Sequence, residues 1–206
     1  GKIQIAKRLI LAAPPAEYNE VISDVKTLLG SPLDDNMLSD IMREYNHTNL
    51  SIIKSAGGDK VLTCKEGEIK PSIYLDHGKI FEVNHARGEI LSGSALEASD
   101  PAAEALRSST QEEISKYART ALADGHGVVH VISEPGGGVS SLFIGISGFK
   151  LNPRNYWNGR WTSAWRLTDI SAGAGTLAGE SSFLVHYYED GNVQLAARRA
   201  HPARPL

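Results

Sequence analysis

Two histidines are the first side chains in this sequence whose type and spacing could support chemistry. His126 and His130 lie four residues apart. In a strand, that spacing places both side chains on one face about 13 Å apart, which is too far for them to share one metal ion. We expect no acidic or thiol partner beside them. The pair is therefore predicted to be surface histidines, and no metal site is predicted.

The single cysteine is the next candidate. Cys64 lies among apolar neighbours in a predicted strand. A thiol in such surroundings is typically buried and unreactive, and only a thiolate is a good nucleophile. One cysteine also excludes an intrachain disulfide, which is consistent with a reducing compartment.

Two further segments are candidates, one for binding a ligand and one for supplying catalytic carboxylates. The residues Gly173-Ala174-Gly175-Thr176-Leu177-Ala178-Gly179 weakly resemble a dinucleotide loop, but the third glycine is one place late and a strand follows instead of a helix. A connection between strands is the expectation. Glu112 and Glu113 fall early in a predicted helix, where acidic side chains are favourable and solvated.

Catalytic signatures are missing from the sequence. It contains no GxSxG, HExxH, CxxC or Walker A pattern. We therefore predict no catalytic residue, no cofactor and no enzymatic activity. A small-molecule enzyme remains an alternative that depends only on the glycine segment and the two histidines.

Composition restricts the class of protein. The chain has 206 residues, of which 41% are hydrophobic and 22% charged, with a formal net charge of −3. Such a balance is typical of a folded domain and does not favour nucleic-acid binding, which needs a basic face. There is no apolar run of membrane-spanning length and no basic-then-apolar leader. A cytoplasmic globular protein is expected.

The first quarter of the chain predicts three amphipathic helices, over 2–13, 18–29 and from about Asp34 onward. Apolar residues recur every three or four positions, as in helices that bury one face. The predicted buried positions are Ile5, Leu9, Ala13, Tyr18, Val21, Ile22, Val25, Leu28, Leu29, Met37, Leu38, Ile41, Met42 and Tyr45. Residues 1–49 are therefore predicted to form a three-helix bundle.

The rest of the chain predicts two further regions of one α+β subunit. Residues 50–99 form a small strand region, with strands at Val61–Cys64 and Lys79–Val83 and a turn at Glu66-Gly67. Residues 100–206 form a helix with Asp100 as N-cap and Gly125 as stop, followed by a five-stranded antiparallel meander. The predicted strands are 128–133, 140–150, 157–169, 177–188 and 192–197, separated by turns at Pro135–Gly138, Asn152-Pro153, Gly173/Gly175 and Asp190-Gly191.

The second of these strands is apolar on both faces. Leu142, Ile144 and Ile146 point one way, and Phe143 and Phe149 point the other. Such a strand needs cover on both faces. The upstream helices can cover one, and only the basic, proline-containing tail 198–205 follows the sheet, so we expect a covering element to be absent. The pair Arg198-Arg199 is interpreted either as a contact to an acidic partner or as part of a frayed, solvated end.

Two segments of the last third, and one near the start, carry a family resemblance. They are Asn152–Trp165 (NPRNYWNGRWTSAW), Val185–Leu195 (VHYYEDGNVQL) and Ala12–Val21 (AAPPAEYNEV). Together with Val61–Cys64, they resemble the alpha subunit of the actin-filament capping protein over essentially the whole chain. The residues that carry the signature are Trp157, Asn158, Gly159, Arg160, Trp161, Trp165, His186, Tyr187, Tyr188, Glu189, Asp190, Gly191 and Asn192.

The tryptophans of the first signature segment have a physical interpretation. Trp157, Trp161 and Trp165 are four apart, so an extended segment places all three on one face. We expect an aromatic patch flanked by Arg160 and Arg166. A role in the core or in a dimer seam is preferred to a direct actin contact.

The resemblance implies a binding protein without a reaction. In the family, alpha and beta subunits of similar fold pair about a pseudo-twofold axis and join their meanders into one sheet, which removes exposed edges. A long helix then crosses the sheet, and a basic amphipathic C-terminal segment binds the barbed end of the filament. Acidic phosphoinositides and short peptide motifs in regulatory proteins tune capping, and the protein belongs to the cytoplasmic cytoskeleton.

This sequence departs from the family pattern at its end, because residues 1–206 contain neither that helix nor that segment. Actin-binding residues are therefore unassigned. The implied partners are a beta subunit or a second copy of this chain, together with the filament's barbed end. The alternative to a capping subunit is a homodimeric or regulatory scaffold with weak or no capping.

Overall fold

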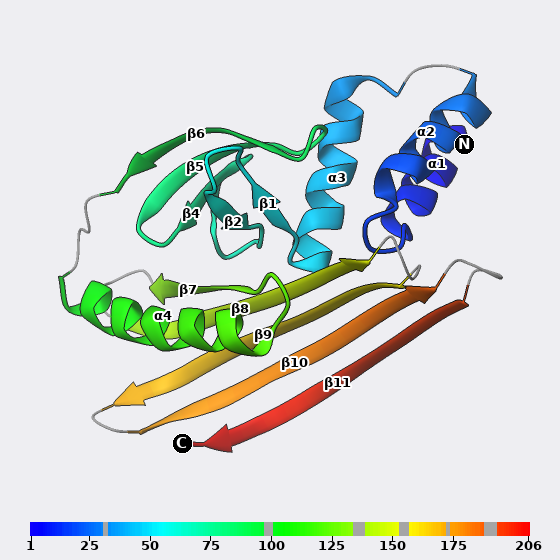
Figure 1. Cartoon of the computed structure of the whole chain (residues 1–206). Helices are drawn as coiled ribbons and strands as arrows, with labels where there is room; N and C mark the ends of the chain where they lie inside the picture. The colour runs from blue at the N-terminus through cyan, green and yellow to red at the C-terminus, as the bar shows by residue number, and fades with distance from the viewer. Residues whose placement is uncertain (31–32, 97–100, 134–138, 153–156, 172–173, 188–192) are drawn as a thin grey trace.

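The structure, a computed structural model, describes residues 1–30, 33–96, 101–133, 139–152, 157–171, 174–187 and 193–206. Figure 1 shows the order of the elements along the chain. The predicted N-cap Asp100, the predicted turns at 135–138 and at Pro153, and the signature residues Tyr188, Glu189, Asp190, Gly191 and Asn192 lie outside these residues.

Three helices form the predicted N-terminal bundle: α1 (Lys2–Leu11), α2 (Tyr18–Leu29) and α3 (Asp35–Asn49). The start of α3 is fixed by Asp34, whose Oδ1 accepts a hydrogen bond of 2.8 Å from the backbone N–H of Met37. Gly30 ends α2 in the left-handed conformation at φ 63°. The buried residues of the bundle are Ala6, Ile10, Ala13, Ile22, Val25, Leu33, Leu38, Ile41, Met42 and Tyr45.

The predicted buried face of the first helix was wrong at Ile5 and Leu9, whereas Ala13 is buried as predicted. Ile5 and Leu9 are 61% and 46% exposed, and the row that packs on the bundle is Ala6, Ile10 and Ala13. Leu28 of α2 and Met37 of α3 are exposed as well, at 76% and 41%. A short amphipathic helix has apolar residues on adjacent rows, and the neighbouring helices decide which row is covered.

Short strands make up the middle of the chain, as predicted, and the structure has six of them among its described residues. β1 (Ile52–Lys54) pairs with β2 (Lys60–Leu62), and a second sheet has the order β3-β4-β5-β6. The strands of this small sheet are β3 (Glu68–Lys70), β4 (Ile73–Asp76), β5 (Lys79–Asn84) and β6 (Glu89–Ala95). Their shared core consists of Ile53, Val61, Tyr74, Phe81 and Val83.

A long helix and a five-stranded antiparallel sheet form the rest of the chain, which confirms the predicted meander. The helix is α4 (Pro101–Ala121), and the main sheet has the order β11-β10-β9-β8-β7. Its strands are β7 (His126–Ser133), β8 (Val139–Asn152), β9 (Trp157–Ser171), β10 (Ala174–Tyr187) and β11 (Val193–Pro205). Among the described residues, none of the helices combines the length and apolarity needed to cross a membrane.

β11 is longer than the sequence indicates. The expected strand ended at 197, but pairing with β10 continues to Pro205, which lies opposite Thr176. Proline lacks a backbone N–H, yet on an edge strand it need not interrupt the ladder to its single neighbour. Of the two interpretations of Arg198-Arg199, the frayed end is therefore wrong.

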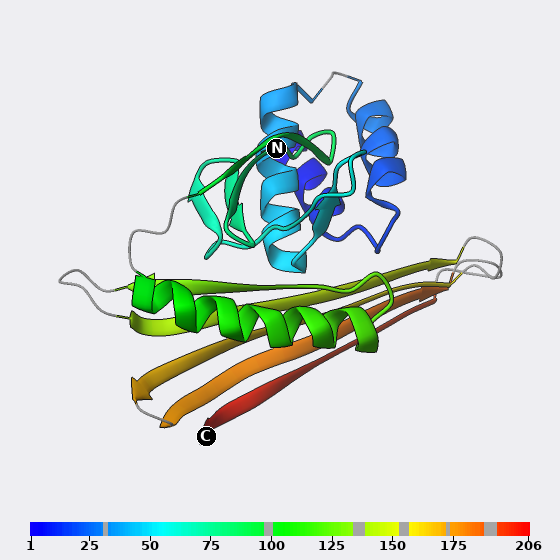
Figure 2. The same ribbon diagram turned by 60° about the vertical axis from the view of Figure 1, so that its left-hand side comes forward.

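Both faces of β8 are covered, contrary to the expectation of a missing cover for this strand. Leu142, Ile144 and Ile146 pack in a core with Ala118 of α4. On the other face, Phe143 packs with Leu62 of β2 and the neighbouring Cys64. Figures 1 and 2 show α4 along β7 and β8, with the helical bundle and the small sheets on the opposite side of the main sheet. The middle of the chain is thus the cover that the sequence did not reveal.

Candidate interaction surface

The three tryptophans of β9 lie on one face of the main sheet, as predicted. Trp161 and Trp165 lie opposite Gly148 and Ile144 in the ladder with β8 and are partly buried against the core that includes Ala118 of α4. Trp157, at the start of β9, is 49% exposed, and its ring centroid is 4.7 Å from that of Tyr187 on β10. The tryptophan row therefore begins at the surface with Trp157 and runs inward to Trp161 and Trp165.

The predicted arginine flanks of this aromatic patch are wrong. Arg160 and Arg166 occupy the alternate positions of β9 and so lie on the opposite face. Arg160 Nη1 donates a 3.3 Å hydrogen bond to Tyr45 Oη, and its guanidinium lies 5.6 Å from the centre of that ring. Arg166 lies 3.4 Å from Glu66. Both arginines therefore attach the sheet to the layer of helices and small strands above it.

The two C-terminal signature segments and the N-terminal one meet at a single carboxylate. Asn158 of β9 and His186 of β10 face each other in the ladder and are 2% and 1% exposed. Both side chains reach Glu17, in the link between α1 and α2: His186 Nδ1 forms a short contact with Glu17 Oε1, and Asn158 Nδ2 donates to the same oxygen across 3.5 Å. Gly159 lies opposite Val185 in the same ladder. The signature residues that the structure describes therefore make mostly internal contacts.

A buried polar network joins α3 to the small sheet. The imidazole of His85 contacts Asn46 Nδ2 through Nδ1 at 3.0 Å and Tyr74 Oη through Nε2 at 3.1 Å. Tyr74 Oη also lies 2.6 Å from His47 Nε2, and Arg43 forms a bidentate contact with Glu68. Burial, reinforced by His47, lowers the pKa of His85 to about 4. His85 is therefore neutral at physiological pH.

Cys64 is buried, as predicted, with 1% exposure. Burial raises the pKa of its thiol to about 12, so it stays protonated and unreactive.

The prediction of surface histidines at 126 and 130 was wrong. His130 is only 3% exposed, and its ring is stacked 6.2 Å from Phe143. Burial lowers its pKa to about 4. His126 does have an acidic partner, because its Nε2 lies 2.9 Å from Asp76 Oδ2. Sequence reasoning missed this partner because 50 residues separate the two positions.

The two edges of the main sheet differ. At the β7 edge, the side chain of Gln111 from α4 donates to Gly127 O at 2.7 Å and accepts from Val129 N at 2.8 Å, so backbone groups of this edge are paired. At the other edge, every residue of β11 except His201 is exposed. Arg198 on this strand contacts Glu180 of β10 at 3.0 Å.

The face of the sheet that carries α4 is open over β9, β10 and β11. Four apolar side chains on this face are substantially exposed: Trp157 (49%), Phe183 (39%), Val193 (60%) and Leu195 (58%). The ladder register places them on the same face, since Leu195 lies opposite Val185 and Phe183 lies opposite Trp161. We call these four residues the open face. An exposed apolar patch beside an exposed strand edge is typical of a protein interaction surface.

Comparison with known proteins first defines the class. The fold is that of an actin capping protein subunit: it matches the solved structure of a homodimeric actin capping protein alpha subunit from Plasmodium berghei with a TM-score of 0.79, over 99% of this chain and 80% of that one, at 19% identity. At that identity the match supports the fold alone.

Sequence comparisons then give the family. The family model for the F-actin capping protein alpha subunit matches residues 6–203. The F-actin-capping protein subunit alpha of Dictyostelium discoideum is 33% identical over 94% of this chain and 69% of its own length. The subunit from Caenorhabditis elegans is 31% identical over 96% of this chain and 71% of its own length. This chain belongs to the F-actin capping protein alpha subunit family.

Proposed function

We propose that this chain acts as one subunit of a dimer that binds the barbed ends of actin filaments and blocks the addition and loss of actin subunits. The role is stoichiometric binding, without catalysis. The observation that carries the proposal is the β11 edge, which is exposed beside the open face.

The β11 edge has the features of a pairing edge over its first half. Residues 193–197 contain no charged residue and no proline, and Val193 and Leu195 expose apolar side chains. Natural proteins protect free edges with charges, prolines or cover. Here the charged and proline residues begin at Arg198, so the unprotected half is the place where a partner strand adds to the sheet. We propose a capping-protein beta subunit as that partner.

A second copy of this chain is the alternative partner. The structural relative from Plasmodium berghei is described as homodimeric, and the same edge and face could pair with their own copy about a twofold axis. In that case, the chain is a homodimeric or regulatory scaffold whose capping is weak or lost.

Contact with actin is assigned to no residue of this chain. The family resemblance places it in a basic C-terminal segment that residues 1–206 do not include. Regulation by phosphoinositides and by peptide motifs of regulatory proteins, and a location in the cytoplasmic cytoskeleton, belong to the same proposal.

A seeded actin elongation assay tests the proposal. The chain is co-expressed with a capping-protein beta subunit, both as printed and extended by a family C-terminal segment. The extended heterodimer is expected to stop growth at barbed ends, and the printed chain to cap more weakly. Unchanged barbed-end growth with the extended heterodimer would show that the proposed activity is wrong. Capping by this chain alone would favour the homodimer.

A further inference from the structure

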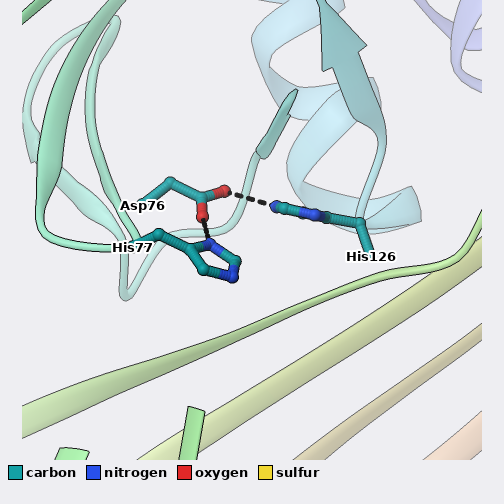
Figure 3. A group of neighbouring side chains, drawn as sticks. All are labelled: Asp76, His77 and His126. Atoms are coloured by element: carbon teal, nitrogen blue, oxygen red, sulfur yellow. Dashed lines mark hydrogen bonds and ion pairs between the residues drawn. The ribbon is translucent and has the colours of Figure 1, made fainter. Parts of the chain in front are cut away.

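Three side chains that could ligate a metal, from two distant parts of the chain, meet below the small sheet. Asp76 is the last residue of β4, His77 follows it in the turn to β5, and His126 is the first residue of β7. Figure 3 shows the Asp76 carboxylate between the two imidazoles. One ligand atom from each residue lies within 4.8 Å of the other two. We propose that these residues form a binding site for one divalent transition-metal ion, with Zn²⁺ as the natural candidate.

The donor set suits such an ion. Two imidazole nitrogens and one carboxylate oxygen are ligands that Zn²⁺ accepts at about 2.0–2.2 Å, with a fourth position left for water. Asp76 Oδ2 and His126 Nε2 are now 2.9 Å apart, and His77 Nδ1 contacts the other carboxylate oxygen. Donors of a tetrahedral zinc site are about 3.3 Å apart, so movements of roughly 1 Å admit the ion.

Neighbouring groups already hold two of the ligands in position. The backbone N–H of Leu62 donates to Asp76 Oδ2 at 2.9 Å. His77 Nε2 lies 3.0 Å from Ser115 Oγ, and this hydroxyl can accept an Nε2 proton when a metal replaces the proton that Nδ1 shares with Asp76. Outer hydrogen bonds of this kind fix the tautomer and orientation of metal-binding histidines. The site therefore has both direct ligands and their supports.

The site is open to solvent on one side. A cavity of about 310 Å³ lies beside Asp76, His77 and His126. The side chain of Asp76 is 0% exposed, whereas those of His77 and His126 are 38% and 14% exposed. An ion can thus enter past the histidines and reach a buried carboxylate, which is stabilised by a bound positive charge.

The lysines around this cavity are paired with carboxylates, and Lys60 shares Asp124 with Lys54. Lys60 Nζ lies 2.8 Å from Asp124, and Lys79 Nζ lies 3.3 Å from Asp59. Because carboxylates pair with these two charges, they oppose an incoming cation less than free lysines do. A bound ion would join the small sheet, through β4, to the main sheet, through β7.

Metal titration of the whole chain tests the proposal. The protein is stripped with a chelator and titrated with Zn²⁺ in a calorimeter, and with Co²⁺ while its visible absorption is recorded. We expect one ion per chain, the intense absorption of a tetrahedral cobalt site, and a melting temperature several degrees higher with Zn²⁺. His126→Gln retains a hydrogen-bond donor toward Asp76, and is expected to weaken binding at least about tenfold.

The matched control is His201→Gln, on β11 of the main sheet, which is expected to bind Zn²⁺ as the wild type does. His77→Gln serves as a second ligand variant, and circular dichroism verifies that each variant is folded. The proposal is overturned if the wild type takes up no Zn²⁺, if folded His126→Gln and His77→Gln both bind as the wild type does, or if Co²⁺ gives only the weak spectrum of the hydrated ion.

Discussion

Among single residues, Glu17 connects more of the family signature than any other side chain described above. Its carboxylate contacts His186 of β10 and Asn158 of β9, both of which are almost fully buried. These contacts attach the link between α1 and α2 to two neighbouring strands of the main sheet. A motif can therefore identify a family because it assembles the fold, and need not touch the filament.

Replacing Glu17 tests this structural role. Glu17→Ala removes the carboxylate that the buried His186 and Asn158 reach, and a buried polar group that loses its partner costs about 1–3 kcal/mol. We expect a loss of that size in the free energy of unfolding, measured with urea. Glu20→Ala, at an exposed position one turn away, is expected to change it by less than about 0.5 kcal/mol. Equal effects of the two substitutions would contradict the role given to Glu17.

His85 gives a prediction about pH. Its pKa is about 4 in the folded chain, against 6.5 in its ordinary state, because burial disfavours the charged form and His47 adds to this. Between these values the unfolded chain binds a proton that the folded chain does not, so stability falls as the pH drops from 6.5 toward 4. Over this pH range the titration of His85 lowers the free energy of unfolding by up to about 3 kcal/mol.

Urea unfolding at several pH values measures this contribution. His85→Gln is expected to be less stable than the wild type at neutral pH, since it alters the contacts with Asn46 and Tyr74. It is also expected to lose less stability on acidification. A variant with the same pH slope as the wild type would show that His85 is not one of the groups responsible.

Single residues also show where sequence reasoning stops. The common face of Trp157, Trp161 and Trp165 could be predicted, because strand geometry alone fixes it. The same rule places Arg160 on the opposite face, so the prediction that Arg160 flanks the aromatic patch was inconsistent with strand geometry. The pairing of His126 with Asp76 depends on how two sheets pack, which no local pattern in the sequence contains.

At the scale of elements, α4 protects one edge of the main sheet. The amide of Gln111 bonds to both Gly127 O and Val129 N of β7, as a partner strand would. The same side chain contacts Ser115 Oγ at 2.9 Å, one turn along α4. This arrangement leaves β11 as the edge that is open to a partner.

Removing this amide is expected to open the β7 edge. Gln111→Leu keeps most of the side-chain volume but leaves the backbone groups of Gly127 and Val129 without their partner, at a cost of about 1–3 kcal/mol. Amide hydrogen exchange at Val129 is expected to accelerate along with this loss. Glu112→Gln, at an exposed position of the same helix, serves as the control. Unchanged exchange at Val129 in the Gln111 variant would contradict the edge-protecting role.

The element types could be predicted from the sequence, whereas their extents and covers could not. Helical periodicity and alternating apolar residues located the four helices and the meander. The end of β11 was missed because arginines and prolines favour a tail locally, while pairing with β10 as far as Pro205 keeps the strand extended. The cover over Phe143 was missed because Leu62 and Cys64, distant in sequence, reach it through the fold.

For the whole molecule, coverage of the main sheet is uneven. β7 and β8 lie between α4 on one face and the helical bundle with the small sheets on the other (Figure 2). The open face and the β11 edge are exposed in the described part of the chain. Sequence resemblance supplied the family, and the arrangement of layers supports the proposal that a partner subunit binds at this part of the sheet. The account therefore requires assembly through this part of the sheet.

Sedimentation of the chain co-expressed with a capping-protein beta subunit tests that requirement most directly. Wild type is expected to form a one-to-one complex, and Leu195→Lys to abolish it, because the lysine would bring an unpaired charge into the interface. Leu91→Lys on β6, where Leu91 is 55% exposed against 58% for Leu195, is expected to assemble like the wild type. A wild-type chain that stays monomeric with the beta subunit, or a Leu195→Lys chain that assembles normally, would contradict the account.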